Sequence, residues 1–116
     1  MLVVDDNYDM AAGLAKLLRL LGHDVQTAAD GPTAIDMALP FRPEIVLLDI
    51  GLPGMDGYEV MRRLRKDDCC RDSLFIAITG YGQEEDLRKA KEAGFDHHMV
   101  KPIDYQALMT VIAQSG

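Results

Sequence analysis

Short apolar runs recur along this chain and alternate with longer stretches in which apolar residues return every three or four positions. The continuous runs are residues 2–4, 45–48, 75–78 and 99–100. A weaker segment, residues 23–29, interleaves small and polar residues around Val25, as an edge strand does. Continuous apolar runs bounded by turn residues are typical of strands buried on both faces. The pattern therefore predicts five strands.

The stretches between the runs predict helices. Their helically spaced apolar residues are Met10, Leu14, Leu17, Leu18 and Leu21 in the first, Ala34, Ile35 and Ala38 in the second, Val60, Met61 and Leu64 in the third, and Leu108, Val111 and Ile112 in the last. Residues 83–93 place acids first and bases later, which suits a helix dipole. Asp30 and Asp104 stand where the N-caps of the second and last helices are expected. Pro40 and Pro43 are expected to close the second helix.

This alternation of strand and helix predicts an α/β fold. Short connections favour right-handed crossovers, and hence a single doubly wound (βα)5 domain whose parallel sheet has helices on both faces. A length of 116 residues suits one domain, here residues 1–116. Ligands of such sheets bind outside the carboxyl ends of the strands, where the winding direction switches. The residues that follow the apolar runs are therefore expected to share one site.

Each continuous run ends in a residue that suits phosphate or metal chemistry. These residues are Asp5 with Asp6, Asp49, Thr79 and Lys101. Close together as bare anions, the carboxylates would force at least one of them to take up a proton, whereas a hard divalent cation removes the repulsion. Carboxylates with a backbone carbonyl and water are a ligand set for Mg²⁺ or Mn²⁺, and the run ends carry no histidine or thiol for zinc.

The same residues suit phosphoryl transfer. A carboxylate is a competent nucleophile towards phosphorus and gives an aspartyl phosphate. Asp49, alone after the central run, is the best candidate for that role, and Asp5 with Asp6 suits a metal pair. Lys101 adds a fixed positive charge that would help to neutralise a phosphoryl group. Thr79 offers a hydroxyl that can hydrogen-bond a phosphoryl oxygen.

Composition narrows the functional classes. The chain has 12 basic and 19 acidic residues and a formal charge of −7, which argues against direct nucleic-acid binding. No apolar run approaches the roughly 20 residues of a membrane helix, and no signal peptide is visible, so a cytoplasmic setting without direct membrane contact is expected. The adjacent Cys69 and Cys70 are expected to be reduced thiols in a loop, because neighbours rarely meet disulfide geometry.

Four segments around the run ends carry a resemblance to a known family. They are residues 2–7 (LVVDDN), 47–57 (LLDIGLPGMDG), 78–80 (ITG) and 99–103 (MVKPI). Through them, and over essentially its whole length, the chain closely resembles the receiver domain of two-component response regulators. The resemblance implies a flavodoxin-like sheet with strand order 2-1-3-4-5.

The resemblance also implies roles for individual residues. Asp49 would accept a phosphoryl group from a phosphohistidine on a histidine kinase or a histidine phosphotransfer domain. Asp5 and Asp6 would hold Mg²⁺, with Asp6 and Asp49 as the expected direct ligands and the backbone carbonyl of Gly51 completing the protein ligands. Such a domain catalyses its own phosphorylation and turns over no outside substrate.

The remaining implied roles concern switching. Thr79, followed by Gly80, would turn towards the phosphoryl group, and Lys101 would pair with it. The Lys101–Pro102 bond is expected to be cis, as in the family. The phosphoryl group would bias a two-state face made by the helix over residues 83–93, the strand that reaches Val100 and the last helix, and an output partner is expected to bind there.

The sequence departs from the family pattern in the switch region. Three residues before Lys101 the family usually has Tyr or Phe, which swings inward, whereas this chain has His98. We keep two interpretations open, a surface histidine and a pH-sensitive switch with a smaller ring. Gly51, two residues after Asp49, has no side chain to position water, and Tyr81 is expected to shield the phosphate. Together they predict a comparatively long-lived phosphoryl group.

The sequence leaves several alternatives open. Residues 79–82 and 94–98 resemble receivers fused to hybrid sensor histidine kinases, so a domain excised from a longer chain is favoured over a stand-alone receiver. A degenerate receiver that only binds partners is one alternative. A Mg²⁺-dependent aspartyl-phosphate phosphatase of the haloacid dehalogenase type needs an acid where Gly51 stands, and a nucleotide- or flavin-binding module needs a glycine-rich loop after the first run. The kinase, the stimulus, the output and the oligomeric state are not specified by the sequence.

Overall fold

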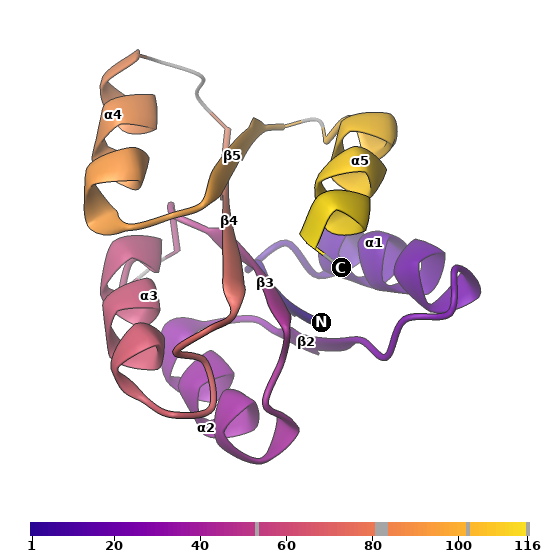
Figure 1. Ribbon diagram of the computed structural model, residues 1–116, viewed down its shortest axis with the longest axis horizontal. Helices are drawn as coiled ribbons and strands as arrows, with labels where there is room; N and C mark the ends of the chain where they lie inside the picture. Colours follow the sequence, from indigo (N-terminus) through magenta and orange to yellow (C-terminus); the bar gives the residue numbers. More distant parts are fainter. Residues whose placement is uncertain (53, 81–83, 102, 116) are drawn as a thin grey trace.

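A computed structural model describes residues 1–52, 54–80, 84–101 and 103–115, without the side chains of residues 84–87 and 115. Its strands are β1 (Leu2–Val4), β2 (Gln26–Ala28), β3 (Ile45–Asp49), β4 (Leu74–Thr79) and β5 (His97–Val100). Its helices are α1 (Tyr8–Leu20), α2 (Gly31–Phe41), α3 (Gly57–Lys66), α4 (Glu84–Ala93) and α5 (Tyr105–Ser115). The strands form one parallel sheet in the order β2-β1-β3-β4-β5, which confirms the predicted fold (Figure 1).

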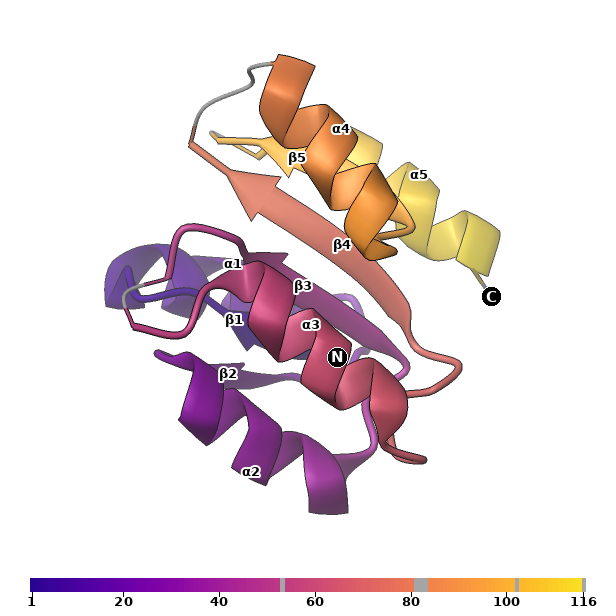
Figure 2. The ribbon, with the colours of Figure 1, turned by 90° about the vertical axis from the view of Figure 1, so that its left-hand side faces the viewer.

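Helices cover both faces of the sheet, with α1 and α5 on one side and α2, α3 and α4 on the other (Figures 1 and 2). The side chains of the central strand β3 are buried by helices on both faces of the sheet. Ile45 and Leu47 belong to the apolar cluster beneath α1 and α5, and Val46 and Leu48 belong to the cluster on the opposite face. A strand whose two faces are both buried has to be apolar throughout, so the continuous run in the sequence reflects two cores rather than one.

Side-chain caps fix where the helices begin. The carboxylates of Asp30, Asp56 and Asp104 accept backbone N–H groups in the first turns of α2, α3 and α5, at 2.8–3.2 Å. These bonds satisfy donors that have no partner within the helix. The N-caps predicted at Asp30 and Asp104 are confirmed.

The α2 helix ends between Pro40 and Pro43, the two residues expected to close it. The helix continues through Pro40 to Phe41, and Arg42 closes it in the left-handed region with φ 50°. Pro40 lacks an N–H donor, yet it lies in the last turn, where few bonds remain to be lost, and the Arg42 N–H still donates to the carbonyl of Ala38 at 2.8 Å.

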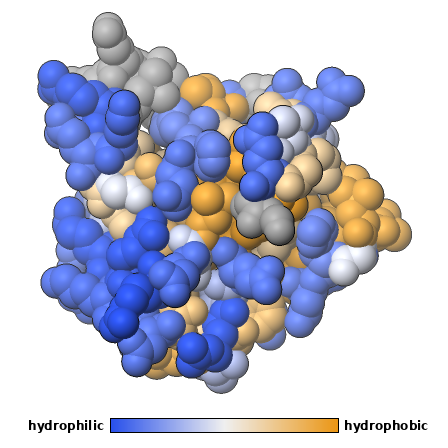
Figure 3. Space-filling model, in the orientation of Figure 1, coloured by the Kyte–Doolittle hydropathy of each residue, from blue (hydrophilic) through white to orange (hydrophobic). Residues whose placement is uncertain are grey.

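The surface is mostly hydrophilic over α3, whereas apolar side chains gather at the end of α1 (Figure 3). There Leu20 and Leu21 are 76% and 52% exposed. None of the helices in the described part of the chain combines the length and apolar character needed to cross a bilayer.

Candidate functional site

The parallel register brings four strand ends to one edge of the sheet, which we call the carboxyl edge: Asp5, Asp6, Asp49, Thr79 and Lys101. Val4 pairs with Leu48, and Thr79 pairs with Val100, so the residues that end or follow these strands lie at the same level. Asp5, Asp49 and Thr79 are only 3%, 6% and 5% exposed. Polar groups this deeply buried need partners, and the partners identify the site.

Lys101 joins two of the carboxylates. Its ammonium Nζ lies 3.0 Å from Oδ2 of Asp49 and 3.1 Å from Oδ2 of Asp5. The backbone N–H of Lys101 donates to the carbonyl of Thr79 at 2.8 Å, so the segment after β5 is tied to the end of β4. One ammonium therefore bridges two strand ends that are 44 residues apart in sequence, Asp5 and Asp49.

The second oxygen of each buried carboxylate is held by the backbone. Asp5 Oδ1 accepts the N–H of Asn7 at 2.9 Å, and Asp49 Oδ1 accepts the N–H of Gly51 at 2.8 Å. These bonds orient both carboxylates without using a further charged side chain. The position of each Oδ2 is then set by the same lysine.

The loop that follows β3 brings the backbone of Gly57 into close contact with the backbone of Asp49 and Ile50. A Cβ on Gly57 would lie 2.5 Å from the Cα of Ile50 and 2.7 Å from the carbonyl oxygen of Asp49. Both atoms belong to the backbone and cannot move aside as a side chain would. Glycine at this position therefore allows α3 to begin close behind the candidate nucleophile.

Negative charge exceeds positive charge at this edge. Carboxylate oxygens of Asp5, Asp6 and Asp49 lie within 4.8 Å of one another. Burial raises the pKa of Asp5, the Asn7 N–H and Lys101 partly oppose that shift, and Asp49 adds to it. Burial alone would lower the pKa of Lys101, but hydrogen bonds to Asp49 and Asp5 outweigh it and leave the pKa raised. Lys101 therefore stays protonated, and one ammonium faces three carboxylates.

The donor set fits a hard divalent cation. Three carboxylates supply oxygen ligands only, and Asp6 is exposed, so the group is reachable from solvent. Within the described ranges, no other group of three or more histidine, cysteine, aspartate or glutamate side chains is placed to hold a metal. The cluster matches the residues predicted from the sequence.

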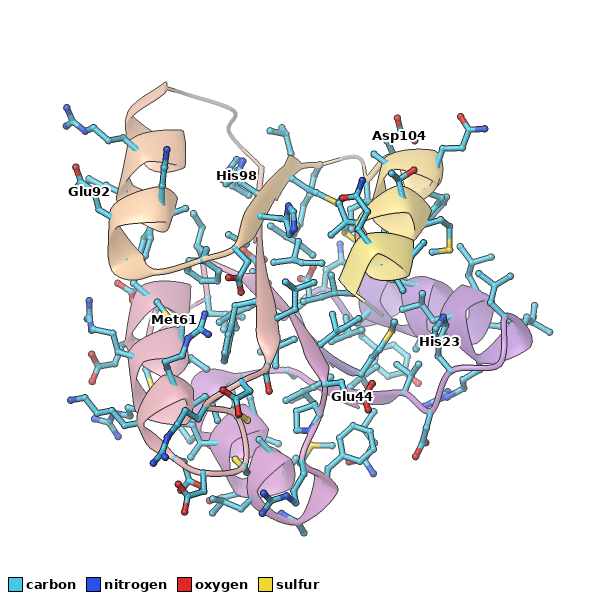
Figure 4. All side chains as sticks on the ribbon, in the orientation of Figure 1. His23, Glu44, Met61, Glu92, His98 and Asp104 are labelled. Carbon is cyan, nitrogen blue, oxygen red and sulfur yellow. The ribbon has the colours of Figure 1, made fainter. Side chains whose placement is uncertain are left out.

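The other predicted residues divide into those near the cluster and those outside the described ranges. Gly51 and Gly80 are exposed beside Asp49 and Thr79 respectively. His98 pairs with Ala77 across β4 and β5, and Ala77 belongs to the core cluster on the α2, α3 and α4 face (Figure 4). The predicted cis bond at Pro102 and the predicted shielding by Tyr81 lie outside the described residues.

Two contributors to the site were not assigned from the sequence. Asn7 caps α1 by accepting the Met10 N–H at 3.2 Å and also donates its own N–H to Asp5. Gly57 makes room for the backbone behind Asp49. An available signal for Asn7 was a favoured N-cap residue just before a helical pattern. Nothing in the local pattern distinguishes Gly57 from the other turn glycines.

An apolar pocket adjoins the carboxyl edge between α1 and α5. It has a volume of about 460 Å³ and is lined by Met10, Leu14, Lys101, Ile103 and Tyr105. Lys101 belongs both to the pocket and to the charged cluster, so a molecule in the pocket would contact the lysine that bonds Asp49.

The comparison with protein families decides the assignment. The model of the response regulator receiver domain matches residues 1–113. The chain belongs to the response regulator receiver family. This confirms the resemblance inferred from the strand-end residues.

Individual relatives agree with the family assignment. Sporulation initiation phosphotransferase F of Bacillus subtilis is 33% identical over 111 residues, a match that covers 96% of this chain and 88% of that protein. Probable histidine kinase 2 of Oryza sativa is 32% identical, but the match covers only 12% of it. The chain spans less than half the length of several relatives. The solved structure of chemotaxis protein CheY4 of Vibrio cholerae superposes with a TM-score of 0.91 at 25% identity, covering 99% of this chain and 96% of that one.

Proposed function

We propose that this receiver domain is a phosphorylation-controlled switch that accepts a phosphoryl group on Asp49 from a phosphohistidine of a partner, in a Mg²⁺-dependent reaction. The observation that carries the proposal is the shortage of positive charge at the carboxyl edge. Three carboxylates lie within 4.8 Å of one another, and two of them, Asp5 and Asp49, bond the ammonium of Lys101. Such a site is suited to a cation and to a phosphoryl group that shares it.

The transfer itself is a displacement at phosphorus. An oxygen of the Asp49 carboxylate forms the new P–O bond, while the P–N bond to the donor imidazole breaks and its electron pair stays on the imidazole nitrogen. The Gly51 N–H at 2.8 Å holds the other oxygen of Asp49 and so limits rotation of the nucleophile. Asp5, Asp6, Asp49 and the Gly51 carbonyl would hold Mg²⁺, which when bound offsets the charge of the carboxylates and phosphoryl oxygens.

Lys101 and Thr79 would contact the phosphoryl group on Asp49 and respond to it. Lys101 bonds both Asp5 and Asp49 in the structure, and a phosphoryl group on Asp49 would offer it a stronger anionic partner. Thr79 stands at the end of β4, with its carbonyl tied to the Lys101 N–H. A movement of either residue would therefore be transmitted to the segment after β5.

The proposed output surface is the face formed by α4, β5 and α5. Val100 and Tyr105 contribute apolar side chains that are 40% and 50% exposed. His98 lies on β5 three residues before Lys101 and is our candidate second switch position. We expect His98→Ala to weaken phosphorylation-dependent partner binding while leaving phosphorylation of Asp49, which we call label uptake, intact. Full phosphorylation-dependent binding by this variant would contradict the switch role.

A histidine kinase or histidine phosphotransfer domain is the proposed phosphodonor. The pocket lined by Met10, Leu14 and Ile103 gives such a partner an apolar contact beside Lys101. We further propose a cytoplasmic setting and no direct contact with nucleic acid. The second proposal agrees with the formal charge of −7.

The alternatives account less well for the site. A degenerate receiver has no need for buried carboxylates that must be neutralised, yet Asp5 and Asp49 are both buried here. A phosphatase of the haloacid dehalogenase type needs a second acid at Gly51, which has no side chain.

The proposal is tested by adding Mg²⁺ and acetyl phosphate, or beryllofluoride as a phosphoryl mimic, to the wild-type chain and to Asp49→Asn. We expect one phosphoryl group per wild-type chain by intact mass, and amide NMR shifts that spread from Thr79 and Lys101 to β5. Asp49→Asn should show neither change. A wild-type chain that gains no label and shows no shift would overturn the proposal.

A further inference from the structure

Two adjacent thiols lie buried in the turn between α3 and β4, at the opposite end of the sheet from Asp49. Cys69 and Cys70 are 7% and 1% exposed, and their Sγ atoms are 3.1 Å apart. They are the two cysteines of the chain and carry no disulfide. The phosphoryl-accepting site makes no use of either thiol.

The backbone of this turn keeps the two sulfurs together. Asp67 accepts the Cys69 N–H through its carboxylate and the Cys70 N–H through its carbonyl, both at 3.1 Å. The Cys70 carbonyl accepts the N–H of Ser73 at 3.1 Å, and the Ser73 hydroxyl donates to the carbonyl of Pro43 at 2.6 Å. The dithiol is thus preorganised by bonds on both sides, which lowers the entropic cost of chelation.

We infer that Cys69 and Cys70 form a chelating dithiol that binds one trivalent arsenical of the arsonous acid type, RAs(OH)₂. Each S–H bond is replaced by an S–As bond, and each arsenic hydroxyl leaves with the thiol proton as water. Arsenic remains trivalent and both sulfurs remain at the thiol level, so the reaction needs no oxidant. The product is a cyclic dithioarsonite that closes over the Cys69–Cys70 peptide.

The geometry favours this ligand over the two usual fates of paired cysteines. A disulfide needs Cα atoms 4.4–6.8 Å apart, whereas neighbouring residues are held about 3.8 Å apart by a trans peptide. Zinc needs four ligands, and within the described part of the chain no third histidine, cysteine or acid joins the pair in a metal-binding group. Trivalent arsenic keeps its organic substituent, is soft, and needs only the two sulfurs.

The surroundings also separate this ligand from ordinary thiol reagents. Cys69 lines an open groove of about 1180 Å³ at the amino ends of the strands, from which an arsenical can approach. Burial, Cys70 and Asp67 raise the pKa of Cys69 to about 12. A thiol that stays protonated reacts slowly with alkylating agents, which require the thiolate. An arsonous acid carries its own proton acceptors in the hydroxyls that leave.

The test uses phenylarsine oxide, which hydrates to an arsonous acid, on the folded 116-residue chain. We expect one phenylarsenic group per chain by intact mass under native conditions, with loss of both titratable thiols. A dithiol such as 2,3-dimercaptopropanol should reverse the uptake, whereas an equal concentration of monothiol should not. Under the same conditions iodoacetamide should leave Cys69 unmodified.

Single-serine variants test chelation directly. Cys69→Ser and Cys70→Ser should each hold phenylarsenic about a hundredfold more weakly than the wild type, because the second sulfur acts at high effective concentration. Label uptake on Asp49 and the far-UV circular dichroism spectrum show that each variant is folded, and Cys69→Ala serves if Cys70→Ser does not fold. Equal retention by wild type and a folded single variant would overturn the inference. Uptake that occurs only in denaturant would also overturn it.

Discussion

The two edges of the sheet use charged side chains in opposite ways. At the carboxyl edge, three carboxylates lie close together and one lysine bonds two of them. At the amino edge, which we define by Arg65, Ser73, Phe75, Gly94 and Asp96, one guanidinium bonds a carboxylate and backbone carbonyls. Arg65 donates to the carbonyls of Ser73 and Gly94 at 3.3 and 2.9 Å and to the Asp96 carboxylate at 3.3 Å. It also lies 4.5 Å above the Phe75 ring.

This difference separates a structural arrangement from a functional one. Asp96 at the amino edge accepts the Phe75 N–H at 2.8 Å as well as Arg65, so acid and base satisfy each other and tie α3 to β4 and β5. The carboxyl edge holds buried carboxylates at the cost of stability: burial, with a smaller contribution from the charge of Asp49, raises the pKa of Asp5. Removing a charge should therefore weaken the fold at one edge and strengthen it at the other.

The largest effect is expected where the backbone of the carboxyl edge is tightest. Gly57→Ala places a Cβ 2.5 Å from the Cα of Ile50, so the loop must shift, and we expect a loss of about 3 kcal/mol in the free energy of unfolding. Label uptake on Asp49 should fall as well, because the added Cβ would also lie 2.7 Å from the Asp49 carbonyl oxygen and displace this residue. Urea unfolding and intact mass measure the two effects.

Gly13→Ala is the matched control for that variant. Gly13 lies within α1 and a Cβ there meets nothing within 4 Å, so alanine should leave stability unchanged or raise it by up to about 1 kcal/mol. Equal stability of Gly57→Ala and wild type would show that the close approach behind Asp49 is not a constraint.

The next effect tests the amino edge. Arg65→Ala removes bonds to three carbonyls and one carboxylate, and we expect a loss of about 2 kcal/mol in the free energy of unfolding. The rate of label uptake on Asp49 should be unchanged at temperatures where the variant is folded. Arg62→Ala is the control, since its exposed pair with Glu59 should contribute little to the free energy of unfolding. Slower labelling of folded Arg65→Ala would show that the two edges are not independent.

A smaller effect of opposite sign is expected at the carboxyl edge. The raised pKa of Asp5 means that its ionised form is disfavoured in the folded state, so at neutral pH without Mg²⁺ we expect Asp5→Asn to unfold at a higher temperature than wild type. The difference should shrink as the pH falls through the raised pKa towards the ordinary value of 3.8, because protonation relieves the wild type.

Asp6→Asn is the control for the higher melting temperature expected of Asp5→Asn. Asp6 is exposed, so its replacement should leave the melting temperature without Mg²⁺ nearly unchanged. Mg²⁺ should stabilise the wild type more than either variant, since both remove a proposed ligand. A lower melting temperature for Asp5→Asn at neutral pH would contradict the view that the carboxyl edge is strained by its charge.

The smallest effect concerns the lifetime of the phosphoryl group. Gly51 is exposed and a Cβ there would lie 3.4 Å from Asp49 Oδ1, an ordinary contact, so a side chain can be added without strain. We expect Gly51→Asn to accept label normally but to lose it severalfold faster, because an amide can position water near phosphorus. Wild-type chain that loses its label as fast as the variant would refute the predicted long lifetime.

The sequence predicts more of the fold than of the detailed geometry of the site. The apolar runs predict the sheet because a strand with two buried faces must be apolar throughout, and β3 shows both faces at Ile45 and Val46. Parallel strands with short crossovers then place Asp5, Asp49 and Lys101 at one edge. The bridging of two carboxylates by one ammonium depends on tertiary distances, which no periodicity contains. The role of Gly57 depends on how closely its backbone approaches Ile50 and Asp49, which the sequence pattern does not predict either.

The most direct test of the account is to locate the label. Wild-type chain treated with acetyl phosphate, with Mg²⁺ or with a chelator, is reduced with borohydride, which converts an aspartyl phosphate to homoserine, and its peptides are then sequenced by mass spectrometry. We predict homoserine at position 49 only, and only in the sample with Mg²⁺. Homoserine at Asp5 or Asp6, or equal conversion of Asp49 in the chelator, would contradict the claim that a cation completes this charge-deficient site.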